Sequence, residues 1–159
     1  MTDPTNAPRV YIDANPFIYF IEGEDVIASR LRPFFDAMKR NPGLAATSEL
    51  TLAEVLPKAK PAARLSYLSL IVRSRLFDLR PVTRTILIDT ADYRRTTTRT
   101  LTDGRRVMSA LPDAIHVVTA VQSRCSAILS GDNGLKAPKG ITTYRPDERG
   151  IEALLRDIA

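Results

Sequence analysis

The amino-acid sequence alternates short β-prone runs with longer segments in which apolar residues recur at helical spacing. The β-prone runs are Arg9–Ile12, Leu44–Thr47, Leu76–Leu79, Ala127–Ser130 and Ile141–Tyr144. Parallel strands need a long crossover, usually a helix, whereas antiparallel strands can be joined by a tight turn. The alternation therefore predicts an α/β fold with a mainly parallel five-stranded sheet that helices cover on both faces, an α/β/α sandwich.

Local signals mark where the expected helices begin and end. Asn15-Pro16 supplies an N-cap and a first helical position, and the short helix that follows should stop near Gly23. Further helices are expected from Asp25 to Asn41, from near Thr51, over 62–75, from Thr83 into an arginine-rich segment, over Ala114–Ser123 and around 151–155.

Length and composition place the chain in the ordinary globular class. Its 159 residues suit one domain, which we expect to span 9–159 after a flexible tail at 1–8. No apolar run approaches the ~20 residues needed to cross a bilayer, and the N-terminus lacks the features of a signal peptide. Cys125 is the only cysteine, which excludes an internal disulfide and a cysteine-cluster metal site. We therefore expect a cytoplasmic protein with no membrane partner.

The positive charge of the chain is concentrated in one segment. The formal net charge is +5, and the stretch RRTTTRTLTDGRR contains five arginines and one aspartate. Arginine binds phosphate through its planar, bidentate guanidinium group. A solvent-exposed helix end or loop is the alternative interpretation of this segment. The candidate phosphate-binding residues are Arg94, Arg95, Arg99, Arg105 and Arg106.

The unit Leu111–Gly134, which we expect to form one helix followed by one strand, has an acidic residue near each of its ends. Asp113 lies in the first helical turn, and Asp132 comes just after the strand. In an α/β unit both positions lie at the carboxyl edge of the sheet, where such sheets bind ligands. Asp13 follows the first strand, and Glu54 lies at the start of the helix after the second. The sequence therefore predicts four carboxylates at one edge.

Each of these acids also has an explanation that involves no ligand. Asp13 can satisfy amides in a strand-to-helix turn, and Thr51-Leu-Ala-Glu54 fits a capping box. Asp113 can stabilise a helix dipole, and Asp132 precedes Asn-Gly in an ordinary turn. Together, however, four like charges repel one another strongly, so either some stay protonated or a cation lies among them.

The ligand chemistry of such a site is that of a hard metal ion. Carboxylate oxygens without histidine or thiolate ligands favour Mg²⁺ or Mn²⁺ over zinc. One or two such ions can activate water and stabilise the leaving oxygen of a phosphodiester. Combined with the arginine-rich segment, this chemistry predicts hydrolysis of nucleic acid.

Four stretches carry a resemblance to a known family, and they are VYIDANPFIYF, TSELTLAEVL, LPDAIHVVTA and ILSGDNGL. Over almost its whole length the chain resembles the PIN-domain nucleases, most closely the VapC-type toxins of type II toxin–antitoxin systems. The resemblance implies a PIN-like domain that dimerises, binds Mg²⁺ or Mn²⁺ and cleaves RNA. It also implies a small antitoxin partner, a segment of which lies over the active-site groove.

Carried over position by position, the resemblance implies an acidic site at Asp13, Glu54, Asp113 and Asp132. Asp13 and Asp113 correspond to direct metal ligands, and the other two complete the shell directly or through water. Glu49, five residues before Glu54, competes with it as the second acid. We prefer Glu54 because the matching stretch places it there and the turn before it presents it beside the strand edge.

Three further polar residues lie near the expected acidic site in the sequence or one helical turn from it. Asn15 and Ser130 are candidates for hydrogen bonds that orient the carboxylates or a water molecule. His116 is the single histidine, and we expect it to pack within a helix rather than act as an acid or base.

The predicted activity is that of a metal-dependent endoribonuclease, the toxin of a toxin–antitoxin pair. One alternative is a phosphohydrolase that uses Asp13 as nucleophile, but the haloacid-dehalogenase pattern requires a second aspartate where this chain has Asn15. The other alternative is a non-catalytic module that binds RNA or a protein.

Overall fold

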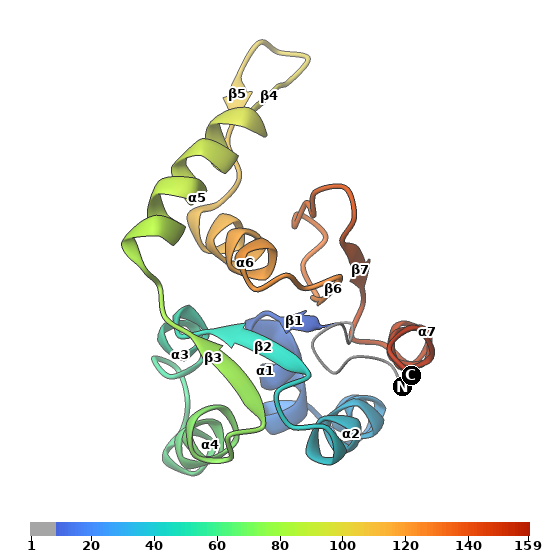
Figure 1. Cartoon of the computed structure of the whole chain (residues 1–159). Coiled ribbons are helices and arrows are strands. Elements are labelled where there is room, and N and C mark those ends of the chain that lie inside the picture. Colours follow the sequence, from blue (N-terminus) through green and yellow to red (C-terminus); the bar gives the residue numbers. More distant parts are fainter. Residues whose placement is uncertain (1–8) are drawn as a thin grey trace.

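A five-stranded sheet forms the centre of the protein (Figure 1). The computed structural model describes residues 9–159, so the tail expected at 1–8 lies outside the described residues. Neighbouring strands follow the order β3-β2-β1-β6-β7, and every neighbouring pair is parallel. The strands are β1 (Val10–Ile12), β2 (Ala45–Ser48), β3 (Phe77–Arg80), β6 (Ala127–Leu129) and β7 (Thr142–Tyr144). The predicted α/β fold with a parallel five-stranded sheet is confirmed.

Helices connect the strands, as the alternation of the sequence predicts. Both α1 and α2 lie between β1 and β2, and α7 follows β7. No helix within residues 9–159 is both long and apolar enough to cross a membrane. The helices are α1 (Ala14–Glu22), α2 (Asp25–Arg40), α3 (Leu50–Val55), α4 (Pro61–Tyr67), its π-helical continuation η2 (Leu68–Arg73), α5 (Arg84–Thr96), α6 (Leu111–Gln122) and α7 (Glu148–Asp157).

Each face of the sheet has its own core, because successive side chains of a strand point to opposite faces. Val10 and Ile12 of β1 belong to a core that includes Phe17 of α1 and residues of α2, α4 and α7. Tyr11, between them, belongs to a second core with Val117 of α6. Figure 1 shows α6 on one side of the sheet and α1, α2 and α4 on the other. The three residues of β1 are fully buried, as expected for a parallel strand covered on both faces.

The segment between β3 and α6 differs from the predicted helix. The helix α5 ends at Thr96, and the chain then forms an antiparallel hairpin of β4 (Arg99–Thr100) and β5 (Arg106–Val107). The threonines that follow Arg95 have low helix propensity, and Asp103-Gly104 is a typical turn sequence. Gly104 has a φ of +84°, a conformation that favours glycine.

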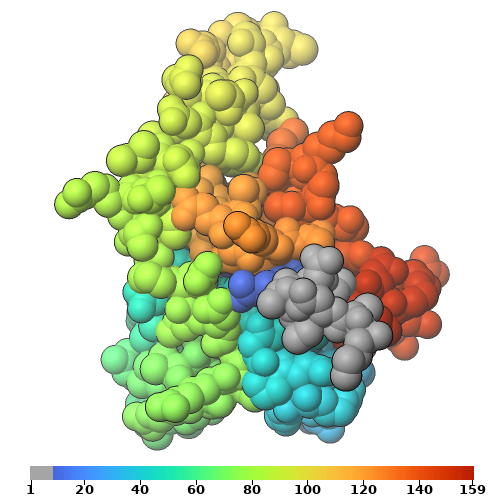
Figure 2. Space-filling model, viewed as in Figure 1, coloured from blue at the N-terminus to red at the C-terminus, as the bar shows by residue number. Residues whose placement is uncertain are grey.

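This segment also gives the molecule its shape. We use the term arm for residues 84–107, which comprise α5 and the hairpin. Figure 1 shows the arm projecting from the sheet beyond α6, and the space-filling view in Figure 2 shows the same projection. The arm therefore presents most of its arginines on an outlying, exposed part of the protein.

Candidate active site

Three adjacent parallel strands bring the predicted acids to one edge of the sheet. The strands β2, β1 and β6 lie side by side, so their chains leave the sheet at the same edge. Asp13 directly follows β1, Glu54 lies in α3 after β2, and Asp132 follows β6. Asp113 lies in the first turn of α6. Segments far apart in the sequence thus contribute one carboxylate each to this edge, which we call the acidic edge.

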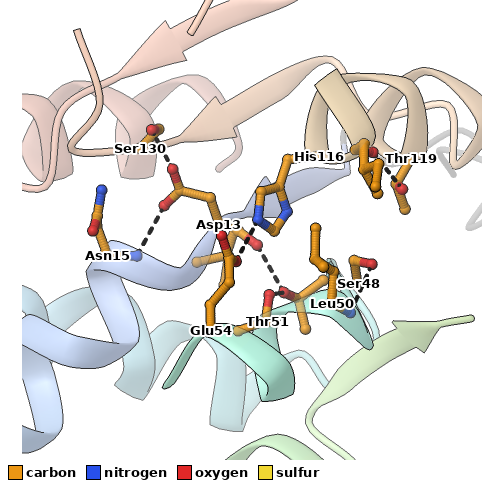
Figure 3. Close-up of polar contacts among 12 residues, drawn as sticks. Asp13, Asn15, Ser48, Leu50, Thr51, Glu54, His116, Thr119 and Ser130 are labelled. Carbon is orange, nitrogen blue, oxygen red and sulfur yellow. Dashed lines mark hydrogen bonds and ion pairs between the residues drawn. The ribbon is translucent and has the colours of Figure 1, made fainter. Parts of the chain in front are cut away.

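Asp13 is fixed at the start of α1 and is 5% exposed. Its Oδ1 accepts a hydrogen bond from the backbone amide of Asn15 (3.2 Å), and its Oδ2 accepts one from the Ser130 hydroxyl (Figure 3). Asp13 is therefore the N-cap of α1, and the prediction that Asn15 caps this helix is wrong. Asp13, the first residue after β1, lies next to the free amide of Asn15 at the start of the helix and accepts its hydrogen bond.

The surroundings of Asp13 change its acidity. Burial raises the pKa of Asp13 to about 6, while the hydrogen bond from Ser130 and the proximity of His116 act in the opposite direction. The charge of Glu54 raises the pKa further. A buried carboxyl group beside another acid gains from a nearby positive charge, so this environment favours a cation.

Ser130 joins Asp13 to Asp132. Its buried hydroxyl donates to Asp13, and the same oxygen accepts a hydrogen bond from the Asp132 amide at 3.0 Å. Asp132 Oδ1 accepts a hydrogen bond from the Gly134 amide at 2.7 Å, so the predicted turn is present. Asp132 therefore both stabilises its turn and contributes a carboxylate to the acidic edge.

Asp132 lies close enough to Asp113 to change its acidity. Burial raises the pKa of Asp113 to about 6, and a hydrogen bond to Asp132 and the charge of that carboxylate add to the effect. Asp13 also raises this pKa, whereas His116 lowers it. A raised carboxyl pKa of this kind arises when like charges are held close together, and it is typical of functional sites.

Glu54 takes part in a partly buried chain of hydrogen bonds that the sequence did not suggest. Its Oε2 lies 2.7 Å from Nε2 of His116 (Figure 3). Nδ1 of His116 in turn lies 2.6 Å from the Tyr11 hydroxyl. Burial raises the pKa of Tyr11 well above its ordinary value, so the phenol keeps its proton. When Tyr11 donates to Nδ1, the neutral ring carries its hydrogen on Nε2 and donates it to the Glu54 carboxylate.

The alternative interpretation of Glu54 as part of a capping box is therefore wrong, and the expectation for His116 is incomplete. The capping box at Thr51 is absent, since α3 begins at Leu50 and has no side-chain cap. Instead, Thr51 Oγ1 lies 3.0 Å from Thr47 Oγ1, and Glu54 turns to His116. His116 is buried in α6 but also bonds to an acid of the edge, so its role is more than helix packing. The signal available in the sequence was its spacing of three residues from Asp113, which places both on one helical face.

Glu49 and Glu54 lie in different surroundings at the two ends of α3. Thr47 donates a hydrogen bond to the Ile12 carbonyl (2.8 Å), which ties the end of β2 to β1 beside Asp13. Glu54 lies about one and a half helical turns after Glu49, and its charge raises the pKa of Asp13. Glu49 is exposed at the N-cap of α3 and makes no side-chain capping bond. The geometry thus places Glu54, rather than Glu49, with the other acids.

The donor chemistry of the acidic edge fits a hard divalent cation. Its candidate ligands are carboxylate oxygens, and the raised pKa values of Asp13 and Asp113 are those of acids that a positive charge would stabilise. Across residues 9–159, no three His, Cys, Asp or Glu side chains are already arranged as a metal site. Mg²⁺ commonly uses only one or two carboxylates and completes its shell with water and substrate phosphates. Asp113 with Asp132, next to Asp13, fits that pattern.

The arginines of the arm occupy different environments. Arg94 donates from Nε to the Ser109 carbonyl (2.8 Å), which ties α5 to the connection into α6. Arg95 pairs with Asp92 and Arg105 with Asp103, both on the surface. Arg99 and Arg106 are exposed, and no ion pair among the described residues involves them.

Several solved structures have a similar fold. A toxin–antitoxin complex from Klebsiella pneumoniae has 20% identity and a TM-score of 0.58, and the match covers 87% of this chain and 98% of that one. VapBC2 from Rickettsia felis, bound to a promoter DNA fragment, has 15% identity and a TM-score of 0.58, covering 86% and 97%. FitAcB from Neisseria gonorrhoeae has 16% identity and a TM-score of 0.57, also covering 86% and 97%.

The family comparison covers most of the chain. No curated protein sequence matches it significantly. The model of the PIN domain, however, matches residues 10–140, a range that contains the whole acidic edge. The chain therefore belongs to the PIN domain family.

Proposed function

We propose that the protein is a metal-dependent endoribonuclease and the toxin component of a toxin–antitoxin pair. The observation that carries the proposal is the acidic edge, where Asp13, Glu54, Asp113 and Asp132 come from separate segments and the pKa values of Asp13 and Asp113 are raised by burial and by the neighbouring acids. A purely structural role for four carboxylates would require charge compensation, whereas only Glu54 has an ionisable basic side chain as a direct partner in the described part of the chain.

Asp13, Asp113 and Asp132 would hold the metal ion, with Glu54 as a further ligand directly or through water. When bound, Mg²⁺ or Mn²⁺ supplies an activated water at neutral pH and stabilises negative charge on the phosphodiester. The roles of the protein groups follow from their contacts. Ser130 orients Asp13, and the pair of Tyr11 and His116 orients Glu54.

The buried position of Asp13 argues against a phosphohydrolase in which this residue is the nucleophile. Both carboxylate oxygens of Asp13 accept hydrogen bonds, one from the Asn15 amide and one from the Ser130 hydroxyl. Hydrogen bonds to the carboxylate reduce its capacity to attack phosphorus, and burial leaves little room for an in-line approach. These contacts are better suited to orienting a metal ligand.

A nucleic-acid backbone is the kind of substrate that the charge distribution favours. The exposed arm carries Arg95, Arg99, Arg105 and Arg106, and we propose that these residues bind phosphates of the RNA. Arg94 belongs to the same surface, but its Nε is already bonded to the Ser109 carbonyl. Since the acidic edge repels phosphate, nearby arginines would lower the cost of bringing an RNA backbone to it.

The similar structures support the proposed partners. One of them is a toxin–antitoxin complex, and another is bound to a DNA fragment from its promoter. We propose that this chain likewise binds a small antitoxin protein, forms a homodimer and acts in the cytoplasm. Size-exclusion chromatography with light scattering would test the dimer, and a monomer at micromolar concentration would contradict it.

Incubation of the purified protein with total RNA, with Mg²⁺ or Mn²⁺ and with EDTA tests the activity. We expect cleavage with either metal and none with EDTA. The variant Asp113→Asn should be inactive, while Asp25→Asn should retain activity. Asp25 is the matched control because it is also an aspartate in the first turn of a helix, but it lies in α2 and is exposed. Full activity of Asp113→Asn would contradict the proposal.

A further inference from the structure

A pocket of about 170 Å³ lies beside the acidic edge, where the arm meets the start of α6. It shares a wall with Asp113. Three segments form its lining: the end of α5 with the hairpin, the connection into α6, and the loop after β6. The lining residues that matter for its chemistry are Thr97, Arg99, Val107, Met108, Ser109 and Lys136.

Hydrogen bonds from the end of α5 hold these three segments together. Arg94 donates to the Ser109 carbonyl (2.8 Å), and the hydroxyls of Thr97 and Ser109 lie 3.3 Å apart. On the opposite wall, the Tyr93 hydroxyl donates to the Lys136 carbonyl. The pocket is therefore a preformed part of the fold, as is usual for small-molecule sites.

The lining combines positive charge with an apolar surface. Arg99 and Lys136 are exposed cations, and Asp113 is the only acid in the wall. Val107 and Met108 supply apolar contacts, and the Met108 side chain is 47% exposed. A nucleotide presents a phosphate that binds cations and a flat base that packs on apolar groups or on a guanidinium plane. The volume is below the roughly 300–1,000 Å³ of pockets for larger ligands, so it has room for the base of a single nucleoside.

We propose that this pocket binds one nucleoside of the RNA next to the cleaved phosphodiester, with its flanking phosphate on Arg99 and Lys136. This inference rests on the proposed nuclease function. The shared wall with Asp113 means that a nucleoside held here brings its own phosphate to the acidic edge. In this arrangement the hairpin selects and positions RNA, and Arg94 and Tyr93 maintain the shape of the pocket.

Binding can be tested separately from cleavage. Fluorescence anisotropy with labelled homopolymers of uridine, adenosine or cytidine about ten nucleotides long, in EDTA, measures affinity without metal. For the tightest of the three, Lys136→Met should weaken binding about 5–10-fold and reduce the salt dependence by about one counterion. Its matched control is Lys139→Met, a change of an exposed lysine three residues later that does not line the pocket.

A second pair of variants tests the pocket by filling it. Ala110→Trp places a large side chain in the lining and should weaken binding about tenfold, whereas Thr102→Trp at the exposed hairpin turn should leave it unchanged. If the wild type cleaves RNA but Lys136→Met and Ala110→Trp bind and cleave like it, the pocket proposal is wrong and the nuclease proposal stands. That result would also be expected if the pocket holds an antitoxin segment instead. If the wild type cleaves no RNA with Mg²⁺, the nuclease proposal fails, whatever the binding shows.

Discussion

The acidic edge and the basic arm carry opposite charge, and they are built in opposite ways. Asp13, His116 and Ser130 are each at most 5% exposed and are held by hydrogen bonds between different segments. Arg99 and Arg106 are exposed on a two-stranded hairpin away from both cores. The geometry of the edge therefore depends on the sheet, whereas the exposed side chains of the hairpin can change without affecting the sheet.

This difference corresponds to two proposed tasks of the protein, cleavage of the phosphodiester at the acidic edge and binding of the RNA backbone by the arm. Groups that perform chemistry need fixed positions, which buried hydrogen bonds supply. Groups that attract a phosphate backbone act over longer distances and tolerate motion. Substitutions at the edge should therefore reduce the rate of the chemical step, and substitutions in the arm should reduce affinity.

The largest effect is expected for Asp13→Asn. Loss of a direct metal ligand should reduce kcat by more than the about 10–100-fold typical of residues that only orient ligands. The asparagine can still cap α1, so circular dichroism should show an unchanged fold. Single-turnover cleavage of a labelled RNA measures the rate. A kcat within a factor of about ten of the wild type would mean that Asp13 serves only as a helix cap.

Substitution of His116 should have the next largest effect. His116→Leu removes the hydrogen bond to Glu54 and should reduce kcat about 10–100-fold with little change in KM. His116→Gln retains an N–H donor and should recover part of that loss, which a purely space-filling role would not predict. Equal rates for the two variants would contradict the positioning role. Thermal unfolding of both variants provides the control for stability.

In the arm, Arg106→Ala should weaken RNA binding about 2–10-fold and lower the salt slope by about one. The free energy of unfolding should change by no more than about 0.5 kcal/mol, because the side chain is exposed and makes no ion pair in the described region. Cleavage at saturating RNA should keep its wild-type kcat. A large fall in kcat would show that the arm takes part in the chemistry.

The smallest expected effect is a pH-dependent change in the thermal stability of the variant Asp113→Asn. The pKa of Asp113 is raised from 3.8 to about 6, so the unfolded chain releases this proton first and stability falls as pH rises from about 4 to 6. Without metal, Asp113→Asn should therefore raise Tm at pH 7.5 by about 2–4 °C. The gain should shrink towards pH 4.5, where the folded state keeps the proton, and it should vanish below about pH 3, where the unfolded state keeps it as well. A gain that is equal at both pH values would mean that repulsion at the edge is not its cause.

The parts of the structure that follow from chain periodicity could be predicted. The five strands and the common edge of the acids follow from parallel pairing, because residues after parallel strands must meet at one end of the sheet. What could not be predicted depends on side-chain partners across the fold. Glu54 bonds to His116, 62 residues away in sequence, and His116 bonds to Tyr11, 105 residues away.

The hairpin was missed for a different reason. Its strands contain two residues each, too few for a period-two pattern to appear in the sequence. The arginines hide the signal further, since they are compatible with an exposed helix end. The cap of α1 was assigned to Asn15 because asparagine before proline is a common helix start, whereas in the fold Asp13 is already aligned with the amide.

The central claim is that the four acids form one metal-binding centre, and calorimetric titration with Mn²⁺ at pH 7.5 tests it most directly. The wild type should bind Mn²⁺ saturably, Asp113→Asn should bind it at least about tenfold more weakly, and Asp25→Asn should match the wild type. Wild-type Mn²⁺ affinity in Asp113→Asn would contradict the claim.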